Sequence, residues 1–235
     1  MAGQNYILWL DSLTLDDIPL VGGKNASLGE LAGLLPEDIH VPEGFAVTAQ
    51  AYRDLLESNS LWDGMGEILE TTDWSDMDAA ARMSARLRKM VATAKLPAGL
   101  DAEIRQAYRQ LSDAHGRNVA VAVRSSATAE DLPGASFAGQ HETFLNIRGA
   151  EALVDAVRQC FASLFTQRAI SYRMGKGFAH KDVALSVGIQ RMIRADRASS
   201  GVIFTLDTES GNRDIVMITG VWGLGEAIVQ GIADP

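Results

Sequence analysis

The sequence predicts an α+β fold in which an early helical part precedes a late, mainly antiparallel sheet. Helical periodicity dominates residues 60–115, whereas residues 183–221 consist of apolar, β-branched runs separated by turns. Because the strands follow the helices instead of alternating with them, a regular βαβ repeat is not indicated. We therefore expect one domain over residues 1–235, helix-rich over about 1–115 and sheet-rich over about 116–235.

The first part is expected to contain a short strand followed by several helices. The apolar run Tyr6–Leu10 predicts the strand, and a helix opens at Gly22-Gly23-Lys24 and stops at Pro36. Residues 41–45 indicate a turn before a second strand, and Thr48 is placed to cap the following helix. The apolar stripes that predict helices are Leu28, Leu31 and Leu35, then Met83, Leu87, Met90 and Val91, then Leu100, Ile104, Tyr108 and Leu111.

The second part is expected to supply most of the sheet. A β-rich run over residues 119–123 ends at Arg124, and residues 143–147 predict another strand. Helical periodicity over residues 150–174 then precedes an apolar run over residues 183–193. One helix is therefore expected among the strands of this part.

The last segments predict a β-hairpin. Apolar runs over residues 201–206 and 214–221 flank the polar turn Thr208–Asn212. The chain then stops at Pro235, soon after a glycine-rich turn. We therefore expect a fragment of a longer protein, with a domain that is incomplete at its C-terminus.

The composition disfavours several classes of protein. The formal net charge is −9, and an acidic chain repels nucleic-acid phosphates at long range, so no nucleic-acid partner is expected. No run of about 18 apolar residues occurs, so no membrane span is expected. Cys160 is the only cysteine, which excludes an intrachain disulfide, and its apolar neighbours indicate a buried thiol. These features favour a cytoplasmic protein.

A glycine-rich segment with one lysine, residues 22–27, invites comparison with a P-loop but fails the pattern. Ile18 stands where the first glycine belongs, and Asn25 replaces the Ser or Thr that would hold magnesium. Glycines at a helix N-terminus still allow a close approach to phosphate, and Lys24 adds a full positive charge. On the residues alone, a surface turn with a solvated lysine is the competing interpretation.

Three other patterns indicate no site. Residues 223–228 resemble a dinucleotide fingerprint, but Ile228 occupies the position of the third Gly or Ala, so a tight turn is expected. No Gly-x-Ser-x-Gly elbow of a serine hydrolase occurs. No metal ligands are expected among the four histidines, which lack a metal-binding spacing; they are His40, His115, His141 and His180.

An arginine at the end of an apolar strand is the stronger signal. Arg124 must find an anion or a carboxylate if it is buried, and its guanidinium fork suits two phosphate oxygens at once. A structural ion pair with Glu130 or Asp131 is an equally good interpretation of the spacing. The loop after it, residues 134–143, offers small residues and hydroxyls that suit a phosphate-covering segment.

Taken in order, four segments resemble the phosphoenolpyruvate synthase and pyruvate phosphate dikinase superfamily. They span nearly the whole chain, and four long motifs in order are far more specific than any one of them. A fifth segment, Phe204–Gly211, is similar to the synthase branch in particular. The four segments are Val21–Leu31, Val41–Phe45, Arg124–Asp131 and Ser136–Gln140.

The resemblance implies an ATP-grasp-like nucleotide-binding domain. Members of the family use ATP to phosphorylate a histidine on a separate, swivelling domain, and a barrel-shaped domain passes the phosphoryl group to pyruvate. The products of the synthase are phosphoenolpyruvate, AMP and phosphate. The family's phosphorylated histidine matches none in this chain, and its Mg²⁺ ligands lie beyond Pro235, so the chain alone is expected to be inactive.

The resemblance also implies roles for individual residues. Lys24 would neutralise the phosphates of ATP, and Arg124 would clamp them in the transition state. Gly139 and Thr143 would belong to the loop over the phosphates, and Gln190 would lie at the adenine. Such roles suit phosphoryl transfer, which depends on positioning and charge stabilisation.

Two other functions stay open at this point. An antibiotic phosphotransferase of the rifampin type would share the nucleotide domain, although residues 206–210 favour the synthase. A non-catalytic nucleotide-binding module would suit the chain length. The joint presence of Lys24, Arg124 and Gln190 speaks against the module, because a protein without nucleotide chemistry needs none of the three.

Overall fold

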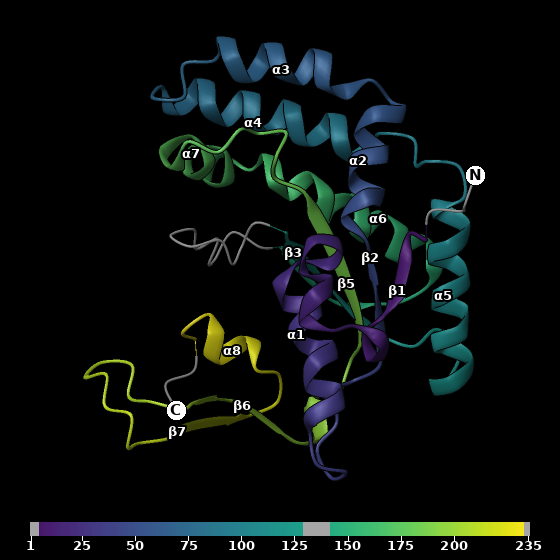
Figure 1. Ribbon diagram of the computed structural model, residues 1–235, viewed down its shortest axis with the longest axis vertical. Helices are drawn as coiled ribbons and strands as arrows, with labels where there is room; N and C mark the ends of the chain where they lie inside the picture. Colours follow the sequence, from purple (N-terminus) through teal and green to yellow (C-terminus); the bar gives the residue numbers. More distant parts are fainter. Residues whose placement is uncertain (1–4, 129–141, 233–235) are drawn as a thin grey trace. The chain divides into compact units, whose positions relative to one another are not determined.

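The computed structural model describes residues 5–128 and 142–232 of the chain (Figure 1). The chain divides into two compact units, residues 1–192 and residues 193–235. Helices and antiparallel strands make up both units, which confirms the predicted α+β class. The ATP-grasp-like relationship and the single domain expected over residues 1–235 stay predictions.

A five-stranded antiparallel sheet forms the centre of the first unit. The strand order is β1-β2-β5-β3-β4, so a strand from late in the sequence, β5, lies between two early ones. This order brings the predicted segments around residues 44, 124 and 190 together within three neighbouring strands. The strands are β1 (Ile7–Trp9), β2 (Gly44–Val47), β3 (Val121–Ala127), β4 (Thr143–Ile147) and β5 (Leu185–Arg191).

Helices cover both faces of this sheet. The helix α1 packs against β3 and β5, while α2, α5 and α6 contact the strands from their other side (Figure 1). The outer helices α3, α4 and α7 add a further layer over α2 and α6. The α-helices are α1 (Ile18–Leu34), α2 (Ala49–Ser58), α3 (Leu61–Thr71), α4 (Met77–Ala92), α5 (Leu100–His115), α6 (Ala150–Ala162) and α7 (Gln167–Lys176), and the short 3₁₀ helices are η1 (Leu10–Ser12), η2 (Leu15–Asp17) and η3 (Ser163–Phe165).

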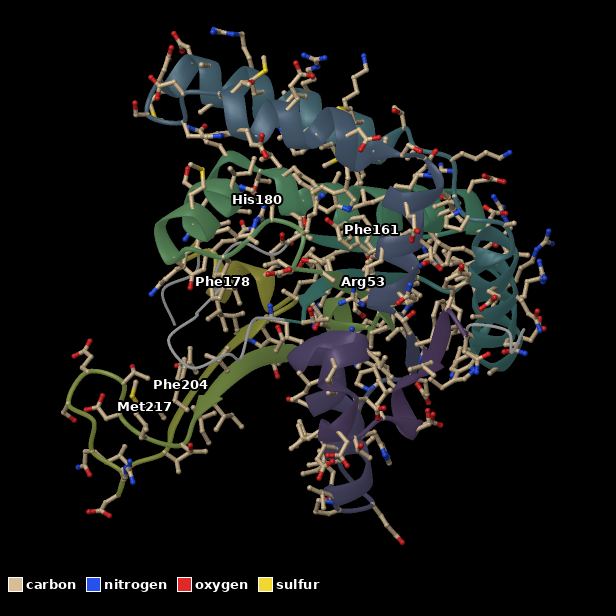
Figure 2. All side chains as sticks on the ribbon, turned by 45° about the horizontal axis from the view of Figure 1, so that its top comes forward. Arg53, Phe161, Phe178, His180, Phe204 and Met217 are labelled. Carbon is tan, nitrogen blue, oxygen red and sulfur yellow. The ribbon has the colours of Figure 1, made fainter. Side chains whose placement is uncertain are left out.

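The main hydrophobic core lies on the side of the sheet that α2, α5 and α6 cover. The stripes predicted for α4 and α5 do point into it, and Leu87, Ile104 and Leu111 are buried. Phe161 of α6 packs against Tyr52 of α2 with ring centroids 5.6 Å apart, in the middle of the view in Figure 2. Burial of this many large side chains supplies the main driving force for folding of the first unit.

Strand alternation gives the opposite face of the sheet a different composition. Along β3, Val121 and Val123 belong to the main core, whereas Arg124 projects to the other side. The strand continues past Arg124 to Ala127, so the prediction that it ends at Arg124 was wrong. Continuation lets the strand pair with β5 on both sides of the arginine.

The helix α1 meets this second face through small residues. Its buried positions include Gly22, Ala26 and Gly29, while Leu31 of the predicted apolar stripe is exposed. The helix was therefore predicted correctly but its buried side was not. Small side chains let the backbone of α1 approach the sheet closely, and of the predicted leucines Leu28 packs against the buried cluster around Val21 and Ala26.

The N-terminus of α2 departs from the prediction in one respect. Thr48 occupies the N-cap position, but its side chain makes no capping hydrogen bond. The hydroxyl of Thr48 is buried without a hydrogen-bond partner among the described residues. The helix is held instead by its apolar side, with Tyr52, Leu55 and Leu56 fully buried.

The second unit contains the predicted hairpin. Met217 is paired with Phe204 across the two strands, and both residues are labelled in Figure 2. The turn between the strands includes a hydrogen bond from the backbone N–H of Gly211 to the carbonyl of Asp207, 2.8 Å long. The elements are η4 (Ala195–Arg197), β6 (Ser199–Phe204), β7 (Met217–Trp222) and the short helix α8 (Glu226–Val229).

Candidate functional site

A cavity of about 370 Å³ lies where α1 meets β3 and β5. Its wall contains the glycine-rich turn of α1, the arginine of β3 and the end of β5. The lining residues are Leu10, Gly23, Lys24, Asn25, Ser27, Leu28, Leu31, Arg124, Ser125, Gly188 and Gln190. Three residues predicted from the sequence, far apart along the chain, therefore share one cavity.

Strand register sets the spacing of two of these residues. Arg124 of β3 is paired with Gly188 of β5, and Ala122 is paired with Gln190. Residues that face each other across two antiparallel strands project to the same side, as do residues two apart in one strand. Arg124 and Gln190 therefore both project toward α1, one strand apart and offset by two residues.

Lys24 reaches the cavity because α1 is broken just before it. Gly22 has φ +72° and ψ 161°, which is not a helical conformation, and the helix resumes after it. The same glycine leaves no room for a Cβ, because Ser126 of β3 lies against it. A helix start within α1 thus lies at the cavity, with Gly23 and Lys24 in its lining.

Gln190 is held at the other end of the cavity by its amide group. Its Nε2 donates a hydrogen bond of 3.0 Å to the backbone carbonyl of Pro42, and the side chain is 8% exposed. Gly44, which is paired with Gln190, has no room for a Cβ against the carbonyl of Ile189. This bond uses one of the two amide N–H groups and leaves the carbonyl oxygen and the second N–H for other partners.

The lining of the cavity combines cationic and apolar side chains. Two cationic side chains, Lys24 and Arg124, line it together with apolar Leu10, Leu28 and Leu31. Among the residues that the structure describes, the lining contains no carboxylate, although the chain as a whole is acidic. Such a combination suits a ligand that carries both an anionic group and an apolar ring.

Gly139 and Thr143 are the two other residues that were predicted to belong to the site. Gly139 lies outside the described residues, as do Glu130 and Asp131, the alternative partners of Arg124. Thr143 is described at the start of β4, where it is paired with Arg124 and exposed, and it does not line the cavity. Its predicted role over the phosphates stays a prediction.

Sequence reasoning missed several residues of the cavity. Asn25 entered only as a departure from the P-loop pattern, yet it is 3% exposed and lines the cavity. Gly188 and Leu10 were not singled out at all. The sequence did offer one signal for Asn25. It is a polar residue on a helix face that otherwise carries small residues, and a polar group buried there needs hydrogen-bond partners.

Among residues 5–128 and 142–232, no group of three or more His, Cys, Asp or Glu side chains is arranged to hold a metal ion. No helix in those same ranges is both long and apolar enough to cross a membrane. Cys160 is fully buried, as predicted, and burial raises the pKa of its thiol well above the ordinary range.

Comparison with known proteins gives a consistent result. The profile of the family described as pyruvate phosphate dikinase, AMP/ATP-binding domain, matches residues 18–235. A phosphoenolpyruvate synthase of Pseudomonas aeruginosa (strain UCBPP-PA14) is 55% identical over 231 residues, which cover 98% of this chain and 29% of that protein. The matched range includes Lys24, Arg124 and Gln190.

Other relatives carry the same description. A phosphoenolpyruvate synthase of Neisseria meningitidis serogroup B is 51% identical over 234 residues, covering 99% of this chain and 30% of the relative. That of Escherichia coli (strain K12) is 50% identical over 230 residues, covering 97% and 29%. The chain thus spans less than a third of the length of these relatives.

Proposed function

Because the chain belongs to the family of pyruvate phosphate dikinase AMP/ATP-binding domains, we propose that its cavity binds the ATP used by a pyruvate, water dikinase. One observation carries the proposal: Lys24, Arg124 and Gln190, which lie far apart in the sequence, line a single cavity. Its volume of about 370 Å³ suits a small-molecule ligand.

The cationic residues would receive the phosphates. Lys24 offers a point charge at the restarted helix, where backbone N–H groups also favour an anion. Arg124 offers a planar fork that can bind two phosphate oxygens. In phosphoryl transfer, charge accumulates on the transferred group, so both cations would stabilise the transition state more than the bound ATP.

The apolar residues would receive the base. Leu10 and Leu28 provide surfaces against which an adenine ring can pack, and Gln190, which lines the same cavity, would offer its carbonyl oxygen. The exocyclic amino group of adenine is a hydrogen-bond donor and therefore matches that oxygen. Gln190 lies on β5 two residues from Gly188, the partner of Arg124, and this offset would separate the base from the phosphates.

The reaction of the full-length protein extends beyond this chain. We propose that a histidine on a separate domain attacks the β-phosphorus of ATP bound here and releases AMP, that water then removes the terminal phosphoryl group as phosphate, and that the phosphoryl group left on the histidine passes to pyruvate on a barrel-shaped domain. ATP, pyruvate and water would yield phosphoenolpyruvate, AMP and phosphate. The names of the relatives support this activity over an antibiotic phosphotransferase or a non-catalytic module. A cytoplasmic location belongs to the same proposal.

Magnesium does not fit the described cavity by itself. Mg²⁺ prefers carboxylate oxygens and water, and none of the lining residues is acidic. We assign no step of the chemistry to the metal in this chain. Its carboxylate ligands are proposed to come from the part of the relatives that this chain does not cover.

Calorimetric titration of the full-length protein with ATP and magnesium tests the proposal. Saturable binding to the wild type, weakened about 10-fold or more by Arg124→Ala, is the expected result, because a charged hydrogen bond to phosphate would be lost. Arg86→Ala is the matched control, since Arg86 is an exposed arginine on α4 and does not line the cavity. Equal affinity of Arg124→Ala and the wild type would exclude Arg124 from the site.

A further inference from the structure

Asn25 is a buried polar side chain in the wall of the cavity. Its Nδ2 donates hydrogen bonds to the carbonyl of Val21 at 3.0 Å and to Oγ of Ser186 at 3.1 Å. Both amide protons are thereby used. Ser186 in turn donates from Oγ to the carbonyl of Val47, 2.8 Å away. One amide therefore connects α1 to β5 directly and to β2 through a hydroxyl.

The bond to Val21 spans the break in α1. Val21 precedes Gly22, the residue with positive φ, and Asn25 follows it in the resumed helix. Lys24 lies inside the loop of chain that this side-chain bond closes. The conformation of the turn, and with it the direction of Lys24, is therefore tied to the Asn25 amide.

The oxygen side of the Asn25 amide lies against β5, the strand that is paired with β3 at Arg124. A Cβ at Gly188 would overlap Oδ1 of Asn25, so the two residues are in close contact. Gly188 is paired with Arg124 and lies two residues before Gln190. Asn25 thus touches the turn that carries Lys24 and the strand that sets the places of Arg124 and Gln190.

We propose that Asn25 is a positioning residue, which holds Lys24 in register with Arg124 and Gln190 across the cavity. The proposal rests on the proposed function, because it concerns the geometry of the same nucleotide site. Asn25 uses both of its N–H groups within the protein and therefore acts through Lys24, with no donor left for a phosphate. A network of buried hydrogen bonds is suited to this task because its loss leaves several polar groups unpaired at once.

A double-mutant cycle in the full-length protein tests the proposal. ATP affinity is measured for the wild type, Asn25→Ala, Lys24→Ala and the double variant. We expect Asn25→Ala alone to weaken ATP about 10-fold or more, because a small misplacement of a charged group is costly. In the Lys24→Ala background the same change should weaken ATP less than about 3-fold, since residues that act through one another are not additive.

Two further variants separate positioning from general stability. Asn25→Leu keeps the approximate size of the side chain but removes both donors without adding a charge, and it should weaken ATP binding as Asn25→Ala does. Ser84→Ala removes another buried hydroxyl, which donates to the carbonyl of Phe165 at 2.8 Å and does not line the cavity. It should leave ATP affinity unchanged even where it lowers the melting temperature.

Hydrogen exchange of residues 21–27 gives a readout that needs no nucleotide. Asn25→Ala should speed exchange there by about 10-fold, and Ser84→Ala should not, because local opening depends on local contacts. Unchanged exchange, wild-type affinity of Asn25→Ala, or additive effects with Lys24→Ala would each overturn the proposal. Equal ATP affinity of the wild type and Lys24→Ala would instead contradict the proposed function, and the positioning role would fall with it.

Discussion

Arg124 of β3 lies directly opposite Gly188 of β5, and Asn25 of α1 occupies the space that the missing side chain of Gly188 leaves open. The helix can therefore approach the sheet beside the arginine, which creates one wall of the cavity. The fold and the candidate site thus depend on the same glycine.

Gly188→Ala should both destabilise the protein and weaken ATP binding. The new methyl group would overlap the Asn25 carbonyl oxygen, and such overpacking costs about 1–3 kcal/mol. Urea denaturation measures the free energy of unfolding. Gly33→Ala is the matched control, because nothing lies near a Cβ there and the change removes a glycine from α1. It should stabilise the helix by about 0.5–1 kcal/mol, and a loss at Gly33 equal to that at Gly188 would refute the steric explanation.

Gln190→Ala should reduce the preference for ATP over GTP. The bond from Nε2 to the carbonyl of Pro42 holds the amide at one end, and under the proposed function its oxygen would face the adenine. That oxygen can accept a hydrogen bond from the amino group of adenine. Guanine has a carbonyl oxygen at the same position, which cannot donate a hydrogen bond to it. Titration of both nucleotides gives the ratio of dissociation constants, which should fall about 10-fold. An unchanged ratio would remove Gln190 from the recognition of the base.

His180 should make the stability of the first unit sensitive to acid. Burial, together with the charge of Arg173, lowers the pKa of His180 from 6.5 to about 4, and Arg173 donates from Nε to its Nδ1 at 3.0 Å. Figure 2 labels His180. Between these two pKa values the unfolded state binds the proton and the folded state does not. The contribution of His180 is therefore complete above about pH 6.5 and is lost as the pH falls toward 4.

Denaturation midpoints across pH 4–7 check this prediction. His180→Gln should flatten the fall in stability below pH 6.5, because glutamine can still accept from Arg173 but does not titrate. His40→Gln is the control, since His40 is exposed. Parallel pH profiles for the wild type and His180→Gln would show that another group is responsible.

Cys160 should resist alkylation in the native protein. Its side chain is fully buried, and burial raises the pKa of the thiol, so both access and the reactive thiolate are suppressed. Mass spectrometry should find iodoacetamide on Cys160 only after unfolding in urea, at a rate at least about 100-fold above the native rate. Rapid labelling of the native protein would contradict the buried position.

Much of the fold follows from periodicity, because each element carries its own pattern. The stripe through Leu100 and Leu111 predicted α5, and the turn at Thr208–Asn212 predicted the hairpin. The buried side of α1 did not follow, since glycine and alanine leave no apolar stripe and the leucines were the only visible signal. Local patterns indicate what a segment forms, and contact with the rest of the chain decides which side it buries.

The site was predictable in part. Lys24 and Arg124 were chosen because their chemistry suits phosphate, Gln190 was implied only by the family resemblance, and all three line the cavity. Asn25 was not chosen, because its role depends on Ser186, which lies 161 positions away in the sequence. No local pattern records such a partner, so only the arrangement of α1 on β5 revealed it.

Protection of Lys24 by ATP tests the central claim most directly. The full-length protein is treated with an amine-acylating reagent with and without saturating ATP, and the modification of each lysine is followed by mass spectrometry. Lys24 lines the cavity and Lys89 is exposed on α4 away from it, so the second lysine is an internal control. We predict that ATP slows acylation of Lys24 about 10-fold or more and leaves Lys89 unchanged. Saturable ATP binding without slower acylation of Lys24 would contradict the placement of the nucleotide in this cavity.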